Sequence, residues 1–270
     1  MTKEALGGKT IIITGASSGI GEATALELGR FSTKLVLVAR RQALLEQAAE
    51  RVRAAGSQAL VAPADLAQIG QIASIVPETL EHFGRVDALL NIAGWGSYSW
   101  LDRMDPNDID MQFRVNVLGM VYLTQAVIPV MRRQGAGHIV NMSSYASKVA
   151  TPVLSMYAST KYAIEGFSDA LRRELLPEGI HVSRVHPGGV RDTEFNQKAS
   201  QRGGVQFDSP SIGSVSKQHT ARRLRRLLER PTPEIYIGRL YDIPRLINNL
   251  WPGLVDFVLA KWVRQKRRLP

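Results

Sequence analysis

Short apolar runs alternate along the chain with longer segments in which apolar residues recur every three to four positions. The short runs are rich in Ile, Val and Leu, and few polar residues interrupt them. Such runs are typical of strands that are buried on both faces of a parallel sheet. They predict seven strands, at Lys9–Thr14, Leu35–Ala39, Ala59–Ala62, Val86–Ala93, His138–Ser143, Ile180–His186 and Ile235–Ile237.

The longer segments predict helices between these strands. The clearest lie at Ile20–Phe31, Gln42–Ala55, 107–134 and 155–176. Strands that alternate with helices imply right-handed crossovers. We therefore expect an α/β fold with a doubly wound parallel sheet of about seven strands and helices on both faces. The least regular stretch, 194–217, is rich in Gly, Ser and Gln and is predicted to be a mobile loop.

Composition excludes several kinds of chemistry. The 270 residues contain no cysteine, so disulfides, thiolate metal sites and cysteine nucleophiles are ruled out, and no metal site is predicted. We find no apolar h-region at the N-terminus and no stretch of about 18 uncharged apolar residues. We therefore expect a cytoplasmic protein without a membrane-spanning helix.

A glycine-rich turn follows the first predicted strand, in the segment Thr14-Gly15-Ala16-Ser17-Ser18-Gly19-Ile20-Gly21. Glycine allows a sharp turn and lets the backbone approach a phosphate closely. The helix that follows points its N-terminal N–H groups and the positive end of its dipole at that position. The alternative is a plain strand-to-helix turn. Because the glycine-rich segment opens the first strand–helix–strand unit, a dinucleotide-binding site is favoured.

The end of the second strand bears on the choice between NAD and NADP. A fold that prefers NAD usually places a carboxylate about 20 residues beyond the glycines, on the ribose 2′-hydroxyl. Here the strand ends in Ala39-Arg40-Arg41, and no carboxylate is present. Arginine offers a planar fork of donors suited to a 2′-phosphate. This favours NADP, whereas the alternative is that both arginines begin a solvated helix.

Tyr157 and Lys161 lie four residues apart in a predicted helix, so their side chains share one face. A phenol has a pKa near ~10, which is high for proton exchange at neutral pH. A nearby ammonium lowers that pKa and would fit Tyr157 for general acid–base chemistry. Taken alone, such a pair is usually an accident of the surface.

The whole set of motifs resembles the single-domain short-chain dehydrogenase/reductase family over about residues 1–240. The matching pieces come in the family's order and spacing: Thr14–Gly21, Asn91-Ile92-Ala93-Gly94, Asn116, Ser143-Ser144, Tyr157 with Lys161, and Pro187-Gly188. In the family a serine lies thirteen residues before the tyrosine, which selects Ser144. The resemblance implies one Rossmann-fold domain over 1–240, followed by a basic amphipathic extension over 241–270.

Catalytic roles follow from the resemblance alone. It implies that Ser144 stabilises charge on the substrate oxygen and that Tyr157 is the general acid/base. Lys161 would lower the Tyr157 pKa and bind the nicotinamide ribose, while Asn116 would support a proton relay through water. Alternatively, Asn116 is a structural residue, a buried amide whose hydrogen bonds are satisfied within the fold. The reaction implied is hydride transfer between NADP(H) and a carbonyl or alcohol carbon.

The resemblance also implies a cofactor site. Asp65 would lie beside the adenine, although it could be a simple turn residue, and Asn91 would brace the central sheet. The expected cofactor-binding residues are Gly15, Ser17, Ser18, Gly19, Ile20, Gly21, Arg40, Arg41, Asp65, Leu66, Asn91, Ala93, Gly94, Tyr157, Lys161, Pro187, Gly188, Val190 and Thr193.

Two positions depart from the family pattern. Ile92 follows Asn91 where many relatives carry a second Asn. The segment Pro187–Thr193 is one residue longer than the usual Pro-Gly-x-Val-x-Thr. We give the cofactor amide contact to Thr193, with Asp192 as the alternative. A fairly apolar substrate is expected from side chains that the family would place near the site: Trp95, Tyr98, Trp100, Val149 and Val153.

Charge is concentrated in the last fifth of the chain. Residues 217–270 hold 13 Lys/Arg against 4 Asp/Glu, which is +9 of the net +10. Within 245–268, apolar pairs recur every four residues, with a break expected at Pro252-Gly253. Three interpretations stay open. The helix packs on its own domain or a sister subunit, it contacts an anionic membrane peripherally, or it binds nucleic acid, which the lack of a recognised module disfavours.

The resemblance further implies a homodimer or homotetramer, formed through the helices at 107–134 and 155–176. The alternative to an enzyme is a non-catalytic NADP-binding sensor or scaffold on the same fold, because fold does not settle function. Such proteins typically lose the tyrosine or the lysine. Here Tyr157 and Lys161 both persist, together with Ser144 and Asn116.

Overall fold

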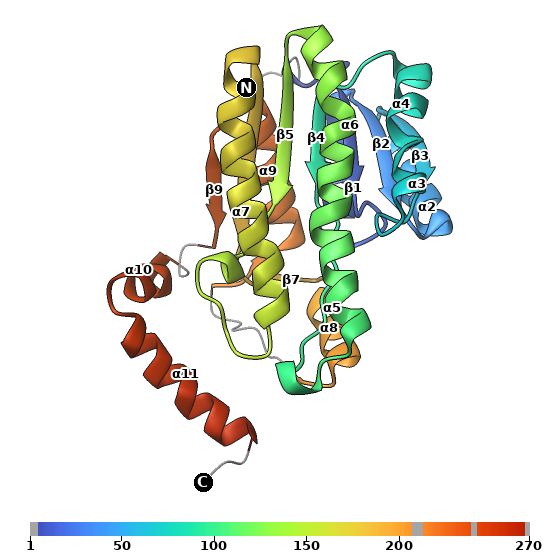
Figure 1. Ribbon diagram of the computed structural model, residues 1–270. Helices are drawn as coiled ribbons and strands as arrows, with labels where there is room; N and C mark the ends of the chain where they lie inside the picture. The colour runs from blue at the N-terminus through green and yellow to red at the C-terminus, as the bar shows by residue number, and fades with distance from the viewer. Residues whose placement is uncertain (1–4, 207–212, 239–241, 268–270) are drawn as a thin grey trace.

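A seven-stranded parallel sheet forms the centre of the computed structural model, which describes residues 5–206, 213–238 and 242–267 (Figure 1). Its strand order is β3-β2-β1-β4-β5-β6-β9, so the chain reverses direction across the sheet between β1 and β4. The doubly wound fold is confirmed, as are all seven predicted strands. Their bounds are β1 Thr10–Thr14, β2 Lys34–Ala39, β3 Gln58–Pro63, β4 Ala88–Asn91, β5 Gly137–Met142, β6 Ile180–Pro187 and β9 Glu234–Ile237.

Both faces of the sheet are covered by helices. Along β1, Ile11 and Ile13 pack into one apolar cluster and Ile12 packs into the other, which explains the unbroken apolar run in the sequence. The first cluster lies under α1 (Gly19–Leu28), α2 (Gln42–Ala54) and α9 (Lys217–Glu229). The second lies under α4 (Ile75–Phe83), α6 (Gly119–Gln134) and α7 (Ser155–Leu175), with the short α3 (Ile69–Ile72) beside them.

A long helical stretch runs from Pro106 to Gln134 across the second face (Figure 1). It consists of α5 (Pro106–Phe113), a π-helical turn over Arg114–Leu118, and α6. By length and mean hydropathy this stretch could cross a membrane, and 44% of its most apolar window is buried in the structure. Its side chains Leu123 and Val127 belong to the core, so we interpret it as a core helix.

The stretch predicted to be a mobile loop contains regular structure. Helix α8 spans Phe195–Gly203, and the strands β7 (Val190–Arg191) and β8 (Val215–Ser216) pair in parallel. Residues 207–212 of that stretch lie outside the described residues. The loop prediction is therefore wrong for 195–203. This helix is amphipathic only weakly in sequence, because it buries small residues such as Ala199 rather than large apolar ones.

Two helices form the C-terminal extension, α10 (Asp242–Leu250) and α11 (Pro252–Arg267). The break at Pro252 is confirmed. The predicted domain boundary at residue 240 lies outside the described residues. Figure 1 shows α11 running away from the sheet, beyond the carboxyl ends of its strands. The extension is held to the body through Trp262, which lies 6.2 Å from Trp100 between ring centroids.

Candidate active site

A cavity of about 1100 Å³ lies at the carboxyl ends of the parallel strands. Gly15 follows β1, Ala93 follows β4, Ser143 follows β5 and Pro187 ends β6, and all four line it. In open α/β sheets, this edge beside the reversal of strand order is where ligands bind. The fold therefore brings segments that are distant in sequence to one site.

The glycine-rich turn fits a phosphate-bearing ligand. Gly15 has φ +71° and Gly19 has φ +60°, a region that L-residues rarely adopt. A Cβ at Gly21 would lie 2.2 Å from the Gly15 carbonyl oxygen, so no side chain fits there. The first turn of α1 begins at Gly19, on the cavity wall, so its backbone N–H groups are available to an anion.

Cationic side chains outnumber acidic ones around the cavity. Arg41 donates hydrogen bonds from Nη2 to the hydroxyls of Ser17 (3.2 Å) and Ser18 (2.8 Å), which joins the end of β2 to the glycine-rich turn. Arg40 also lines the cavity. The pKa of the Arg202 guanidinium is lowered first by the burial of Arg202 itself and then by the charge of Arg40. In total five cations line the cavity against the two acids Asp65 and Glu194: Arg40, Arg41, Lys161, Lys198 and Arg202. Such a wall attracts an anion.

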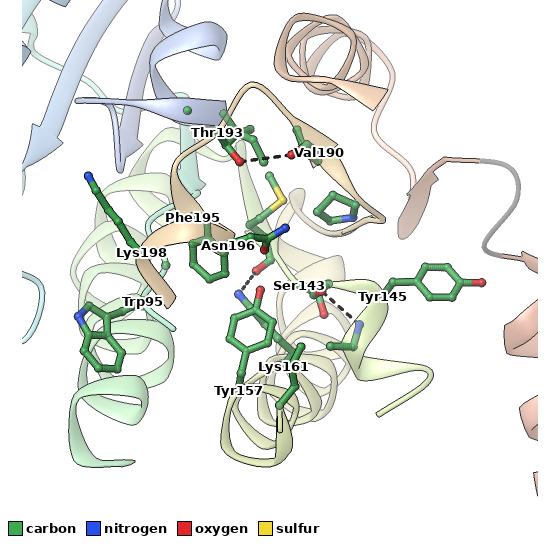
Figure 2. Close-up of a pocket in the computed structure, with 18 of the residues that line it drawn as sticks. Trp95, Ser143, Tyr145, Tyr157, Lys161, Val190, Thr193, Phe195, Asn196 and Lys198 are labelled. Atoms are coloured by element: carbon green, nitrogen blue, oxygen red, sulfur yellow. Dashed lines mark hydrogen bonds between the residues drawn. The ribbon is translucent and has the colours of Figure 1, made fainter. Parts of the chain in front are cut away.

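Tyr157, Lys161 and Ser144 all line the same cavity. Figure 2 shows Tyr157 and Lys161 side by side on their helix. Tyr157 and Lys161 are one turn apart on α7, and Lys161 Nζ lies 5.5 Å from the centroid of the Tyr157 ring. The ammonium donates a 2.8 Å hydrogen bond to the carbonyl oxygen of Met142, at the end of β5. Ser144 follows directly on β5 and begins a tight turn, where its Oγ accepts from the Ala146 N–H.

The pKa values of this group differ from the sequence-based expectation. Burial raises the pKa of Tyr157 to about 12, and a hydrogen bond with Ser144 opposes the rise. Burial also lowers the pKa of Lys161 to about 8, opposed by the carboxylate of Glu165 one turn further along α7. Burial thus favours the uncharged form of both side chains. At neutral pH Tyr157 is neutral, whereas Lys161, with a pKa of about 8, still carries its charge.

Two predicted asparagines make buried structural hydrogen bonds and are not among the residues that line the cavity. The buried Asn116 amide accepts from the Trp95 N–H (2.7 Å) and donates to the Trp95 carbonyl (2.8 Å) and to Thr160 Oγ1 (3.1 Å). It therefore fixes the loop after β4, as a satisfied buried amide. Asn91 donates to Asn141 Oδ1 (2.9 Å) and Thr124 Oγ1 (3.1 Å), which ties β4 to β5 and α6. Its expected place among the cofactor-binding residues is corrected: it braces the sheet.

The other expected cofactor residues all line the cavity. The longer segment after β6 is accommodated at Asp192, whose backbone adopts the left-handed region with φ +64°. Asp tolerates this conformation better than most residues. Asp192 is exposed, and the cavity wall is formed by Thr193, whose methyl lies 3.6 Å from the position of a Cβ on Gly19. The geometry therefore favours Thr193 over Asp192.

A largely buried ionic network behind the site was not predicted from the sequence. The carboxylate of Glu165 on α7 accepts hydrogen bonds from Ser143 Oγ (2.5 Å) and Ser147 Oγ (3.1 Å), and from Lys148 Nζ (2.7 Å) and Arg184 Nη1 (3.0 Å). These contacts fasten the segment 143–148, which carries Ser144, to the helix that carries Tyr157. A signal existed in sequence, because Glu165 continues the four-residue spacing of Tyr157 and Lys161.

His186 lies at the buried end of this network. Its ring stacks on Tyr236 with centroids 4.6 Å apart and lies 3.5 Å from carboxylate oxygens of both Glu165 and Glu234. Burial lowers its pKa to about 4 against the opposing charge of Glu165. The two carboxylates already pair with Arg184 and Lys148, so these groups neutralise one another and we regard the cluster as structural.

Of the five side chains predicted to lie near the substrate, three line the cavity. Trp95, Tyr98 and Val149 line it. Trp100 and Val153 instead pack beside it, in a small apolar cluster with Trp262. The extension supplies a part of the cavity wall that was not predicted from the sequence. Its lining side chains come from both α10 and α11: Pro244, Ile247, Leu254, Val255, Val258, Leu259 and Trp262.

The parallel sheet, the glycine-rich turn at the start of α1, and a tyrosine–lysine pair in the same cavity define a nucleotide-binding oxidoreductase. The chain belongs to the short chain dehydrogenase family, whose sequence profile matches residues 9–203. It is therefore an oxidoreductase of that family, and its nucleotide is NAD or NADP.

Individual relatives cover nearly the whole chain. The "Dehydrogenase/reductase SDR family protein 7-like" of Drosophila melanogaster is 32% identical over 265 residues, which cover 95% of this chain and 81% of that protein. A metagenomic short-chain oxidoreductase, solved in complex with NADP, is 28% identical with a TM-score of 0.75, over 87% of this chain and 98% of that one. A Burkholderia phymatum short-chain dehydrogenase/reductase in complex with NAD shares the fold at 24% identity (TM-score 0.83, covering 94% and 96%).

Proposed function

We propose that this protein is an NADP(H)-dependent oxidoreductase that acts on the carbonyl or alcohol carbon of a fairly apolar substrate. One observation carries the proposal. A single cavity holds the Ser144–Tyr157–Lys161 group and, beyond the glycine-rich turn, the two arginines Arg40 and Arg41. The first group suits proton transfer to an oxygen, and the second suits a phosphate.

The chain's own residues have distinct tasks in this reaction. The nicotinamide, when bound, supplies the hydride to the carbonyl carbon in reduction or accepts it in oxidation. Tyr157 gives its hydroxyl proton to the substrate oxygen in reduction and takes it back in oxidation. Ser144 donates a hydrogen bond to the same oxygen, where negative charge develops. Because burial raises the pKa of Tyr157 to about 12, the phenol carries its proton at neutral pH, as the reductive direction requires.

Preference for the 2′-phosphate rests on the end of β2. Arg41 is already oriented by Ser17 and Ser18, and Arg40 lies beside it on the cavity wall. Strand β2 ends at Ala39, and no carboxylate follows to bind a 2′-hydroxyl. A hydrogen bond to a charged group contributes about 1.5–3 kcal/mol, so one arginine accounts for roughly 10-fold to 100-fold in affinity. NADP preference of one to two orders of magnitude is expected.

The wall around Tyr157 supports an apolar substrate. The Tyr157 ring lies 5.5 Å from Phe195 and 6.4 Å from Tyr98, between ring centroids. Figure 2 shows the Phe195 ring next to the Tyr157 ring. Leu254, Val258 and Trp262 of the extension continue this surface. A ketone or secondary alcohol on an apolar skeleton fits such a wall.

The test combines nucleotide binding with turnover. NADPH and NADH are titrated into the wild type, Arg40→Ala, and Arg133→Ala as a control on the exposed end of α6. Turnover is followed at the nicotinamide absorbance band over a panel of apolar ketones, with Tyr157→Phe. We expect Arg40→Ala to weaken NADPH at least about 10-fold while leaving NADH nearly unchanged, and Tyr157→Phe to abolish turnover.

Other outcomes would contradict parts of the proposal. Equal affinity for NADH and NADPH in the wild type would overturn the NADP preference. Tight binding with no turnover on any carbonyl or alcohol would favour the sensor or scaffold. Homodimer or homotetramer formation, and a cytoplasmic location, stay predictions.

A further inference from the structure

The extension has two apolar sides. Its inner side lines the cavity, as described above. Its outer side carries five apolar residues that lie outside the cavity lining and are more than half exposed: Ile243, Leu246, Leu250, Trp251 and Phe257. Trp251 is 63% exposed and Phe257 is 73% exposed. We call these five residues the outer face.

Helical spacing places the apolar residues of the outer face together on each helix, with cationic side chains beside them on α11. On α10, Ile243, Leu246 and Leu250 share one side because they are three and seven residues apart. On α11, Phe257 shares a side with Lys261 and Arg264 by the same spacing. Lys261, Arg264 and Lys266 are all exposed. On α11 the outer face therefore stands beside cationic side chains.

The body holds this face in a fixed orientation. At the start of the extension, the Arg245 guanidinium lies 4.9 Å from the Tyr236 ring and Asn248 Nδ2 donates to the Lys148 carbonyl (3.3 Å). At its end, Arg267 donates to Asp102 (2.6 Å) and lies 4.2 Å from the Trp100 ring. Because both ends are attached, the outer face is presented to solvent rather than packed on the sheet.

The positive charge of the extension distinguishes between two candidate partners for the outer face, a second copy of the chain and a lipid surface. Residues 243–267 hold five Lys/Arg against one acid, Asp256. A second copy of the chain, paired about a two-fold axis, would bring these cations against one another. A surface of anionic lipids instead offers apolar depth for Trp251 and Phe257 and opposite charge for the lysines and arginines.

We propose that the outer face of α10–α11 docks on an anionic lipid bilayer, with the wall of the cavity at the bilayer surface. An apolar substrate that is dissolved in the bilayer then enters along the inner side of α11. The docking stands on its own, whereas this route rests on the proposed function.

Vesicle flotation of the full-length protein tests the docking. Neutral phosphatidylcholine vesicles are compared with vesicles that also contain phosphatidylglycerol, at low and high salt. We expect binding to the anionic vesicles that weakens with salt. The double variant Trp251→Ser/Phe257→Ser should lose at least about 10-fold in partitioning. Lys261→Gln/Arg264→Gln should lose about 10-fold to 30-fold on the anionic vesicles alone.

Matched controls come from elsewhere on the surface. Leu176→Ser replaces an equally exposed apolar residue, at 59%, beside the amino end of β6, and Arg133→Gln replaces an exposed cation on α6. Both should bind vesicles as the wild type does. Thermal unfolding and nucleotide titration of every variant confirm an intact fold and cofactor site, so a failure of docking is distinguishable from a failure of the proposed function.

Three results would overturn the proposal. The first is no flotation with either kind of vesicle. The second is equal flotation with neutral and anionic vesicles at all salt concentrations. The third is a dimer in analytical ultracentrifugation that Trp251→Ser/Phe257→Ser dissociates, which would show that the outer face is a contact between subunits.

Discussion

Replacing Glu165 by Gln tests whether the buried network holds the site together. The change keeps the shape of the side chain and removes its charge. The Glu165 side chain is 12% exposed and pairs with Lys148 and Arg184, which are 21% and 12% exposed. In the variant an amide would face both cations, and Lys148 would lose its ion pair.

The size of the effect follows from these contacts. Breaking a buried ion pair costs about 3–5 kcal/mol. Arg184 keeps Asp169 and Glu234 as partners, and Lys148 is partly exposed, so we expect a loss at or below the bottom of this range, about 2–3 kcal/mol. For a chain of this size that corresponds to a fall in Tm of roughly 5–10 °C. Ser143 and Ser147 lose the anionic acceptor as well, so the Ser144 segment loosens and kcat should fall with it.

The loss should depend on pH with a definite sign. Burial pushes the pKa of Glu165 upward, but His186, Lys148 and Ser143 together hold it below its ordinary value. A carboxyl group whose folded-state pKa is lowered stabilises the protein above its unfolded pKa, and this contribution disappears as the pH falls through the folded pKa. The wild type and Glu165→Gln should therefore differ most near neutral pH and converge in acid.

Circular dichroism melts from neutral pH into acid, to below the ordinary pKa of a glutamate, measure the difference, with Glu46→Gln on the exposed side of α2 as the control. The control should melt within about 1 °C of the wild type, as exposed substitutions usually do. A Glu165→Gln melt that matched the control at neutral pH would refute the reasoning, since the network would then contribute no net stability.

Three further changes test other parts of the site. Gly21→Ala places a Cβ 2.2 Å from the Gly15 carbonyl oxygen, so nucleotide affinity measured by titration should fall at least about 10-fold, whereas Gly70→Ala, which meets no atom within 4 Å, should leave it unchanged. Asn116→Ala leaves the buried N–H and carbonyl of Trp95 without the amide, and urea unfolding should show a loss of about 2 kcal/mol. Burial lowers the pKa of His138 to about 3, so the unfolded chain binds a proton that the folded chain does not between about pH 6.5 and pH 3. Stability should fall with the pH in that window, and His138→Gln should show a shallower fall in acid melts.

The sheet and the nucleotide site could be predicted because their signals are local. A strand buried on both faces needs an unbroken apolar run, such as Leu35–Ala39, whichever neighbour it pairs with. A turn that must have positive φ at Gly15 and Gly19 needs glycine there. These requirements are met within a few residues, so they can be recognised along the chain without the tertiary structure.

The missed features depend on long-range contacts. Glu165 meets Ser143, Lys148 and Arg184 only after β5, α7 and β6 have packed together. The apolar periodicity of α11 predicts an amphipathic helix but not that Val258 and Trp262 would line the cavity. The hydrogen bond from the Lys161 ammonium to the Met142 carbonyl likewise depends on the end of a strand nineteen residues away in sequence. The raised pKa of Tyr157 depends on burial, which only the packed structure supplies.

The residues that line the cavity fall into two separate parts of the chain, one for the nucleotide and one in the extension. Every residue expected to hold the nucleotide lies between Gly15 and Thr193, whereas the extension adds its wall from Pro244 onward. That second part is attached to the body at its two ends through Tyr236 and Trp100, and its described residues form two helices outside the sheet. Under the proposed function, substitutions there can reshape what the enzyme accepts without disturbing the residues proposed to act in hydride and proton transfer. The specificity of this enzyme can therefore diverge in its last thirty or so residues while its chemistry stays the same.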